Sequence, residues 1–193
     1  MKKLAALRDR LFFTVEDVAD IFGIKRQSAW VFCSRQVNRG YFLRLKNNFY
    51  VLEEIWRVMS KDKLFKLANF LQVPSYISFS AALSYYEVTT QVTRDYFESV
   101  SLKRSVRFNV QQAQFNYYKL KKAYYFGFEK KEGFFIATRE KAFVDAVYLY
   151  SFGKYKLDFG AIDKTKLDRK EIRRIIKAFP EKTQAITEKL CRS

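Results

Sequence analysis

The amino-acid sequence predicts an α+β fold, with an N-terminal winged helix-turn-helix and a C-terminal mixed α/β domain that contains an antiparallel sheet. Three observations support this prediction. Three helical patterns and a short hairpin pattern occupy the start of the chain. Short segments rich in aromatic and β-branched residues follow in the middle. With Gly 6 and Pro 2 among 193 residues, the chain is expected to consist of regular elements joined by short turns.

The first two helices are predicted from apolar spacing and from residues that begin and end helices. Leu4 and Leu7 belong to an apolar pattern with helical spacing. Thr14 and Asp17 have the spacing of a capping box, which predicts that a second helix begins there. Gly23 is suited to end that helix, because glycine readily adopts a positive φ.

A third helix over residues 25–38 and two strands over 41–45 and 49–51 complete the order that is typical of a winged helix-turn-helix. In that fold the third helix enters the major groove, where the base edges carry a full code of donors and acceptors. A rival interpretation is a structural winged helix in a module that binds RNA or protein. The candidate DNA-binding residues are Lys25, Arg26, Gln27, Ser28, Arg35, Arg44, Lys46, Asn47 and Asn48.

The sequence predicts two domains joined by a helical linker. Residues 1–60 form the winged helix-turn-helix domain, 61–73 the linker, and 74–193 the C-terminal domain. Pro74 ends the linker, because a residue that precedes proline is disfavoured in the helical conformation.

The C-terminal domain is expected to combine helices with a β-rich region. Helices are predicted to begin after Ser78, after Thr138 and at Asp168, and the last of them ends near Pro180. The predicted strands are 96–101, 105–110, 113–119, 124–128 and 134–137.

The formal net charge of +17 favours a polyanionic partner, of which nucleic acid is the commonest. Residues 1–60 hold 11 Lys+Arg and 6 Asp+Glu, a net +5, so most of the excess lies in the rest of the chain. A second basic surface is therefore predicted in the C-terminal domain, as an extension of the DNA footprint, as an RNA-binding surface, or as a solvated face. Its candidate residues are Lys103, Arg104, Arg107, Lys119, Lys121, Lys122, Arg169, Lys170, Arg173 and Arg174.

The residue types argue against an enzyme. The chain has no histidine, and its two cysteines, Cys33 and Cys191, do not form a metal-binding pair. Glycine-rich phosphate-binding motifs are absent from the sequence. Glu140 is interpreted as a helix-capping charge, and Lys141 and Asp145 as a surface ion pair. We expect no catalytic residues, no metal and no cofactor.

The expected location is the cytoplasm. The apolar part of the N-terminal segment is too short for a signal peptide, and the two thiols suit a reducing compartment. No apolar run is long enough to span a membrane, so no membrane partner is expected.

Two blocks of residues resemble a known family. Together with the N-terminal helices and hairpin, they resemble the AbiEi antitoxins of type IV toxin–antitoxin (abortive infection) systems, over nearly the whole chain. The first block is Ser75-Tyr76-Ile77-Ser78 followed by Ala82-Leu83-Ser84-Tyr85; the second is Phe126-Gly127-Phe128, then Ile136-Ala137-Thr138-Arg139-Glu140-Lys141-Ala142 and Asp145.

The resemblance implies a phage-defence antitoxin that also acts as a transcriptional repressor. Its N-terminal domain would bind inverted repeats in double-stranded DNA of its own promoter, through the third helix and the hairpin. Its C-terminal domain would carry the antitoxin activity. The functional partner would be a nucleotidyltransferase-like toxin, countered without a stable complex.

Overall fold

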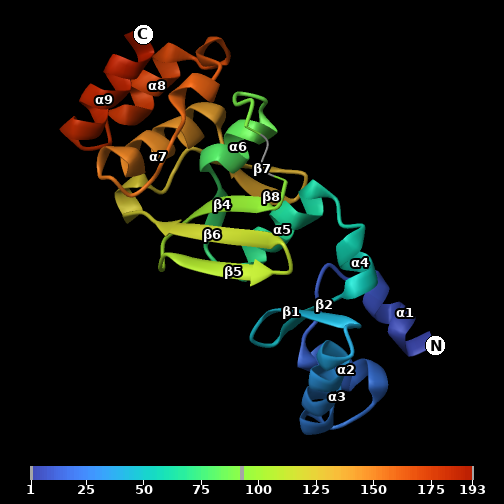
Figure 1. Ribbon diagram of the computed structural model, residues 1–193. Helices are drawn as coiled ribbons and strands as arrows, with labels where there is room; N and C mark the ends of the chain where they lie inside the picture. Colours follow the sequence, from blue (N-terminus) through green and yellow to red (C-terminus); the bar gives the residue numbers. More distant parts are fainter. Residues whose placement is uncertain (1, 92–93, 193) are drawn as a thin grey trace. The chain divides into compact units, whose positions relative to one another are not determined.

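The computed structural model describes residues 2–91 and 94–192, and the fold is of the mixed α+β class that the sequence predicts (Figure 1). The chain divides into two compact units. The first unit comprises Met1–Leu67 and Phe108–Gln112, and the second comprises Ala68–Arg107 and Ala113–Ser193. Helix α5 (Lys61–Leu71) contains the first boundary and accounts for most of the segment that was predicted to be a helical linker.

The first unit consists of short helices followed by a two-stranded antiparallel hairpin, in which Arg44 lies opposite Tyr50. This order of elements agrees with the sequence prediction. The elements are α1 (Lys2–Arg8), α2 (Val15–Phe22), α3 (Arg26–Asn38), β1 (Phe42–Lys46), β2 (Phe49–Leu52) and α4 (Glu53–Arg57).

The predicted capping box at the start of α2 is confirmed. The Thr14 hydroxyl accepts a hydrogen bond from the Asp17 N–H at 3.2 Å, and the Asp17 carboxylate accepts one from the Thr14 N–H at 2.8 Å. Gly23, with φ of 65°, ends the helix in the left-handed conformation. Two backbone donors at the helix start therefore have partners within the chain itself.

The core of the first unit is largely aromatic and aliphatic. Phe13 and Tyr50 exchange two backbone hydrogen bonds of 2.9 Å, which attach the segment before α2 to strand β2. Cys33 lies among these buried side chains, and burial raises the pKa of its thiol to about 11. Cys33 is therefore a core residue rather than a reactive thiol.

The second unit contains most of the strands of a six-stranded sheet with the order β5-β6-β4-β3-β8-β7. The sheet is mixed rather than antiparallel throughout: β4 pairs with β6 and β3 with β8 in parallel, whereas β3 pairs with β4 and β7 with β8 antiparallel. Strands β4 and β5 follow one another in the sequence, but β6 lies between them in the sheet, so they do not form a hairpin. The strands are β3 (Ser75–Ile77), β4 (Tyr96–Ser101), β5 (Val106–Val110), β6 (Ala113–Lys119), β7 (Phe128–Lys131) and β8 (Phe134–Ala137).

The predicted strand over 124–128 is wrong. Residues Lys122–Tyr124 form a short 3₁₀ helix, η1, and strand β7 begins only at Phe128. Glu132 and Gly133, with φ of 47° and 84°, make a two-residue turn that allows β7 to pair with β8 up to Lys131. Positive φ at both turn residues is the geometry that favours a tight hairpin.

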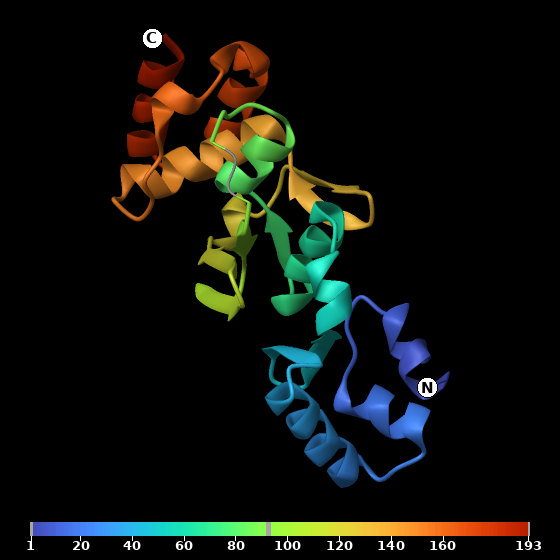
Figure 2. The ribbon, with the colours of Figure 1, turned by 45° about the vertical axis from the view of Figure 1, so that its right-hand side comes forward.

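Helices of the second unit gather around α7 (Figures 1 and 2). Helix α6 contacts α7 and β4, and both α8 and α9 contact α7. The predicted caps Thr138 and Asp168 accept hydrogen bonds from first-turn N–H groups of α7 and α8. The remaining elements are α6 (Phe79–Tyr85), α7 (Arg139–Ser151), α8 (Arg169–Ile176), α9 (Glu181–Arg192), and the 3₁₀ helices η2 (Phe159–Ala161) and η3 (Lys164–Lys166).

Helix α9 lies outside the sequence prediction, which treats Pro180 as the end of the helical region. Pro180 instead precedes α9, and its carbonyl accepts hydrogen bonds from Thr183 and Gln184 at 2.8 and 3.1 Å. Proline is well tolerated at a helix start, because the N–H that it lacks has no partner there. Within the described residues, no helix is long and apolar enough to cross a membrane.

A fully buried ion pair joins α7 to the sheet. The Lys141 ammonium donates to Asp145 and, at 2.9 Å, to the Tyr76 hydroxyl. Tyr76 and Ser78 donate to the same Asp145 oxygen at 3.0 and 2.8 Å. The prediction of a surface pair is wrong, because α7 is enclosed by α6, α8 and α9 and is buried along most of its length.

Gly127 leaves the space that the Lys141 side chain occupies. A Cβ atom at Gly127 would lie 3.0 Å from Lys141 Cγ, and the Gly127 φ of +71° is unfavourable for other residues. The ammonium also lies 5.2 Å from the centre of the Phe126 ring and 5.4 Å from that of Phe179. These rings and the hydroxyls of Tyr76 and Ser78 together enclose the charge pair of Lys141 and Asp145.

We predict that Gly127→Ala lowers the free energy of unfolding by at least about 2 kcal/mol. The cost of the strained backbone and the cost of the close contact between the new Cβ and Lys141 add to each other. Gly153→Ala is the matched control: its φ is +67°, but a Cβ there meets open space, so about 1 kcal/mol is expected. Urea denaturation measures both values. Equal losses for the two variants would show that the Lys141 contact contributes nothing.

Candidate nucleic-acid interfaces

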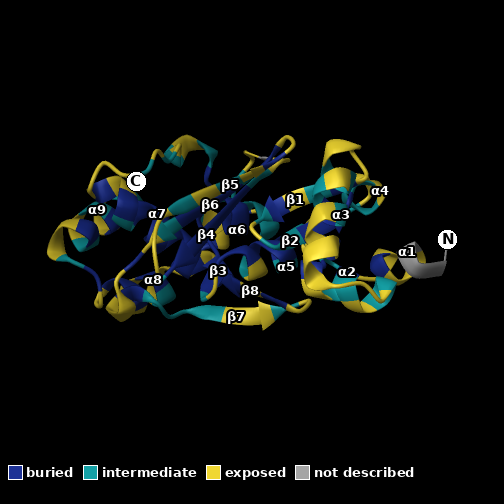
Figure 3. Cartoon of the chain, turned by 90° about the horizontal axis from the view of Figure 1, so that it is seen from below, coloured by how far each residue is buried: buried dark blue, intermediate teal, exposed yellow. Residues whose placement is uncertain are grey.

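The start of α3 presents polar groups to solvent. Lys25, Arg26, Gln27 and Ser28 are all exposed, and much of α3 is exposed in Figure 3. Lys25 is the N-cap residue and makes no side-chain capping hydrogen bond, and the first turn of α3 contains no acidic residue. Backbone N–H groups at this helix end are therefore available to an anion, alongside the side-chain donors.

One carboxylate links the start of α3 to the hairpin turn. Glu16 accepts from the Arg26 guanidinium at 2.6 Å and from the Asn48 side-chain amide at 2.7 Å. Asn48, with φ of 62°, also accepts from the Val15 N–H at 2.9 Å. The hydrogen bonds from Asn48 and Arg26 lower the pKa of Glu16 to about 2. This link, the Glu16 bridge, connects α2, α3 and the turn between β1 and β2.

The hairpin contributes further cationic and amide groups. The Arg44 guanidinium lies 5.6 Å from the centre of the Tyr50 ring, and the Lys46 ammonium lies 4.2 Å from that of Phe49. Asn47 is exposed at the turn. Arg35, on the last turn of α3, is exposed as well. All of the predicted DNA-binding residues thus lie on α3, at its N-cap, or on the hairpin.

Two apolar residues accompany the polar groups of α3. Trp30 and Val31 are exposed by 39% and 43%, although both are large and apolar. Exposed apolar side chains beside hydrogen-bonding groups match the edge of a thymine, which carries both a methyl group and an acceptor in the major groove.

A comparison with models of known protein families finds no match, and no curated protein matches the sequence. The chemistry of the described side chains is therefore the basis for a functional interpretation. Among these residues, no group of three or more histidine, cysteine or acidic side chains is arranged to hold a metal ion.

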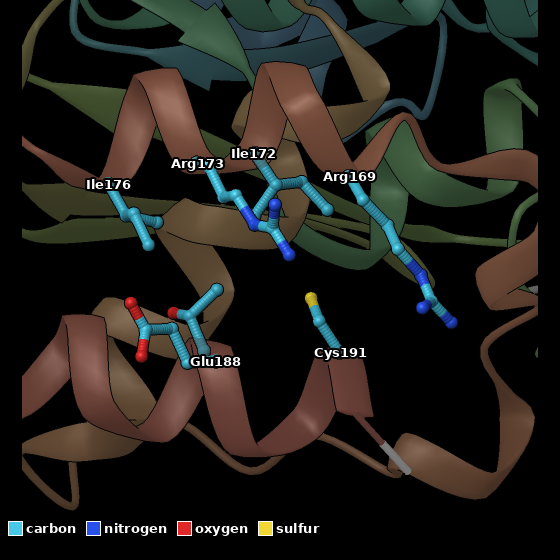
Figure 4. A pocket seen from close by; sticks show the side chains of 7 residues that line it. Arg169, Ile172, Arg173, Ile176, Glu188 and Cys191 are labelled. Carbon is cyan, nitrogen blue, oxygen red and sulfur yellow. The ribbon is translucent and has the colours of Figure 1, made fainter.

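The residues of the predicted second basic surface line more than one cavity. Lys119 and Lys121 line a cavity of about 550 Å³ near the end of β6 and the end of α7. Arg169 and Arg173 line another, of about 220 Å³, between α8 and α9, where Glu188 and Cys191 face them (Figure 4).

The other predicted basic residues lie elsewhere on the second unit. Arg107 donates to the Asn116 side chain at 2.7 Å, and Arg174 forms an ion pair of 2.6 Å with Glu171. Like Arg107 and Arg174, the remaining residues of the predicted surface are exposed and line neither of these two cavities: Lys103, Arg104, Lys122 and Lys170.

Sequence reasoning missed a third cavity of about 450 Å³, which has the buried Glu98 at its base. The Glu98 carboxylate accepts from the Tyr155 hydroxyl at 2.8 Å, from the Ser80 N–H at 3.1 Å and from the Tyr118 hydroxyl at 3.4 Å. Burial raises the pKa of Glu98 to about 7, although these hydrogen bonds oppose that change. Lys154 and Lys156 belong to the same lining.

The sequence contains one signal for Glu98, but it does not identify the partners of this residue. Glu98 lies within a segment predicted as a strand, and because β4 is buried on both faces this glutamate must be buried and must have partners. Those partners come from α6, β6 and the loop after α7, and no local pattern predicts that they meet.

We predict that Glu98 makes the stability of the protein fall as the pH rises. The folded-state pKa of about 7 exceeds the ordinary value of 4.5, so the folded protein binds the extra proton between these values. The free energy of unfolding therefore decreases from about pH 4.5 through pH 7, by a total on the order of 3 kcal/mol.

Glu98→Gln should remove this decrease, whereas Glu129→Gln, at an exposed position, should preserve it. Thermal denaturation between about pH 5 and pH 8 measures the difference. A wild-type profile that runs parallel to that of Glu98→Gln would contradict the assignment of the raised pKa to Glu98.

Proposed function

We propose that the first unit is a winged helix-turn-helix that binds double-stranded DNA, and that the chain is the autorepressing antitoxin of a type IV toxin–antitoxin system. The observation that carries the DNA-binding part is the Glu16 bridge. It holds the start of α3 and the hairpin turn by hydrogen bonds of 2.6 and 2.7 Å, so both elements present their donors as one body. Pre-ordered donors lose less entropy when they bind.

The proposed contacts follow from the chemistry of each element. Gln27 and Ser28 suit base edges in the major groove, where an amide side chain can bind adenine with two hydrogen bonds. Arg44 and Lys46 on the hairpin suit phosphates, which set the register of the protein on DNA. Trp30 and Val31 would contact thymine methyl groups. The partner is the promoter of the chain's own gene, with inverted repeats.

The antitoxin part of the proposal rests on the two motif blocks. Tyr76 and Ser78 from the first block and Gly127, Lys141 and Asp145 from the second belong to one buried cluster. The resemblance thus involves residues that depend on one another. The implied role is that of a cytoplasmic regulator without catalytic activity, which counters a nucleotidyltransferase-like toxin without a stable complex. A nucleotidyltransferase gene beside the gene for this chain is the genomic observation that this role requires.

We predict that the protein shifts duplex DNA from its own upstream region at lower concentrations than it shifts unrelated duplex. Because phosphate contacts release counterions, the logarithm of the affinity should fall linearly with that of the salt concentration, by about 0.9 per neutralised phosphate. Arg26→Ala combined with Gln27→Ala should weaken specific binding by about tenfold to a hundredfold and non-specific binding much less.

The matched control carries Asn38→Ala and Arg39→Ala, which remove the same kinds of side chain from the other end of α3. Both control residues are exposed. The control should retain most of its preference for promoter DNA. Equal affinity for promoter and unrelated duplex would refute the repressor role, and an equal loss in both double variants would refute the role of the helix start.

A further inference from the structure

The cavity at the end of β6 has a strongly basic lining. Lys119, Lys121 and Lys154 contribute to it, and all three lysines are exposed. Among the described residues that line this cavity, none is acidic. An opening of about 550 Å³ with this lining attracts an anionic ligand.

The same cavity contains an exposed aromatic ring. Phe152, the residue that follows α7, is 44% exposed and lines the cavity. The Tyr148 ring supports it in an edge-on contact at 5.4 Å, and the Lys182 ammonium lies 5.4 Å from its centre. An exposed, supported ring beside lysines is suited to stack on a planar base whose phosphates are neutralised nearby.

This cavity adjoins the one above Glu98. Tyr118 and Lys154 belong to the linings of both, and Lys156 extends the basic character into the second. The Glu98 carboxylate is not exposed to a ligand in this cavity, because it is fully buried and accepts hydrogen bonds from the Tyr155 and Tyr118 hydroxyls. The two cavities form a track with four lysines and several aromatic rings.

We propose that this track, on the second unit, binds unpaired nucleotides of a single-stranded nucleic acid. One base stacks on Phe152, and Lys119, Lys121 and Lys154 contact the phosphates around it. A duplex hides the faces of its bases, so it offers nothing for an exposed ring to stack on. The inference goes beyond the proposed promoter binding, because it involves none of the residues of α3 or the hairpin.

The test uses the full chain with labelled oligo(dT) and oligo(U) of about ten nucleotides, and fluorescence anisotropy reports their binding. Phe152→Ala should weaken binding by about tenfold, the effect of one lost stacking contact. Tyr150→Ala is the matched control: Tyr150 is 41% exposed on the same helix but does not line the track. It should change the affinity by less than about twofold.

Three variants separate base stacking on Phe152 from folding and from promoter binding. Phe152→Trp should retain binding, and Phe152→Leu should weaken it about as much as Phe152→Ala does, because leucine preserves apolar contact but not stacking. Arg26→Ala combined with Gln27→Ala should leave single-strand binding unchanged, so a failure of the promoter proposal does not affect this test.

A comparison of the affinities for the two oligomers also identifies the ligand. Tighter binding of oligo(U) indicates RNA, and equal affinity for both oligomers indicates single strands of either kind. The proposal is overturned if neither oligomer binds, if an unlabelled duplex of the same length competes equally well, or if Tyr150→Ala weakens binding as much as Phe152→Ala does.

Discussion

The buried ion pair between Lys141 and Asp145 is the constraint on which the second unit depends. Removing two opposite charges from water costs several kcal/mol for each ion, and only close partners offset that cost. Tyr76 and Ser78 supply hydrogen bonds of 2.8 to 3.0 Å from β3 and the residue that follows it. Gly127 is required because no Cβ fits beside the lysine stem. Helix α7, the central strand β3 and the segment before β7 are thereby joined at one point.

The motif residues in this cluster stabilise the fold, so the residues that can contact a partner are those on the surface. Several residues of the two motif blocks enclose a charge pair, whereas the cations proposed to bind nucleic acid lie on α3, the hairpin and the cavity linings. In the first unit a single carboxylate, Glu16, plays a comparable ordering role at the surface. The cations of the two proposed nucleic-acid surfaces therefore belong to different units, and the two surfaces share no residue.

Local signals predicted most of the helices, because caps such as Thr14 and Thr138 act within a few residues of the chain. Non-local pairing was harder to predict. Strand β3 is only three residues long, and its neighbours β4 and β8 lie far along the sequence. The Glu98 cavity and the burial of Lys141 depend on which elements meet, so spacing along one helix could not reveal them. The cations Lys119 and Lys121 could be predicted from the local charge. Lys154, which lines the same cavity, follows α7 and is distant from them in the sequence.

The central claim is that each unit carries its own nucleic-acid surface. Its most direct test measures the affinity of the full chain for a labelled single-stranded oligonucleotide, with and without a saturating amount of promoter duplex. Because ligands at separate, uncoupled sites do not alter each other's affinity, the account predicts a change of less than about twofold. Displacement of the single strand by the duplex would contradict it, since one surface would then serve both ligands.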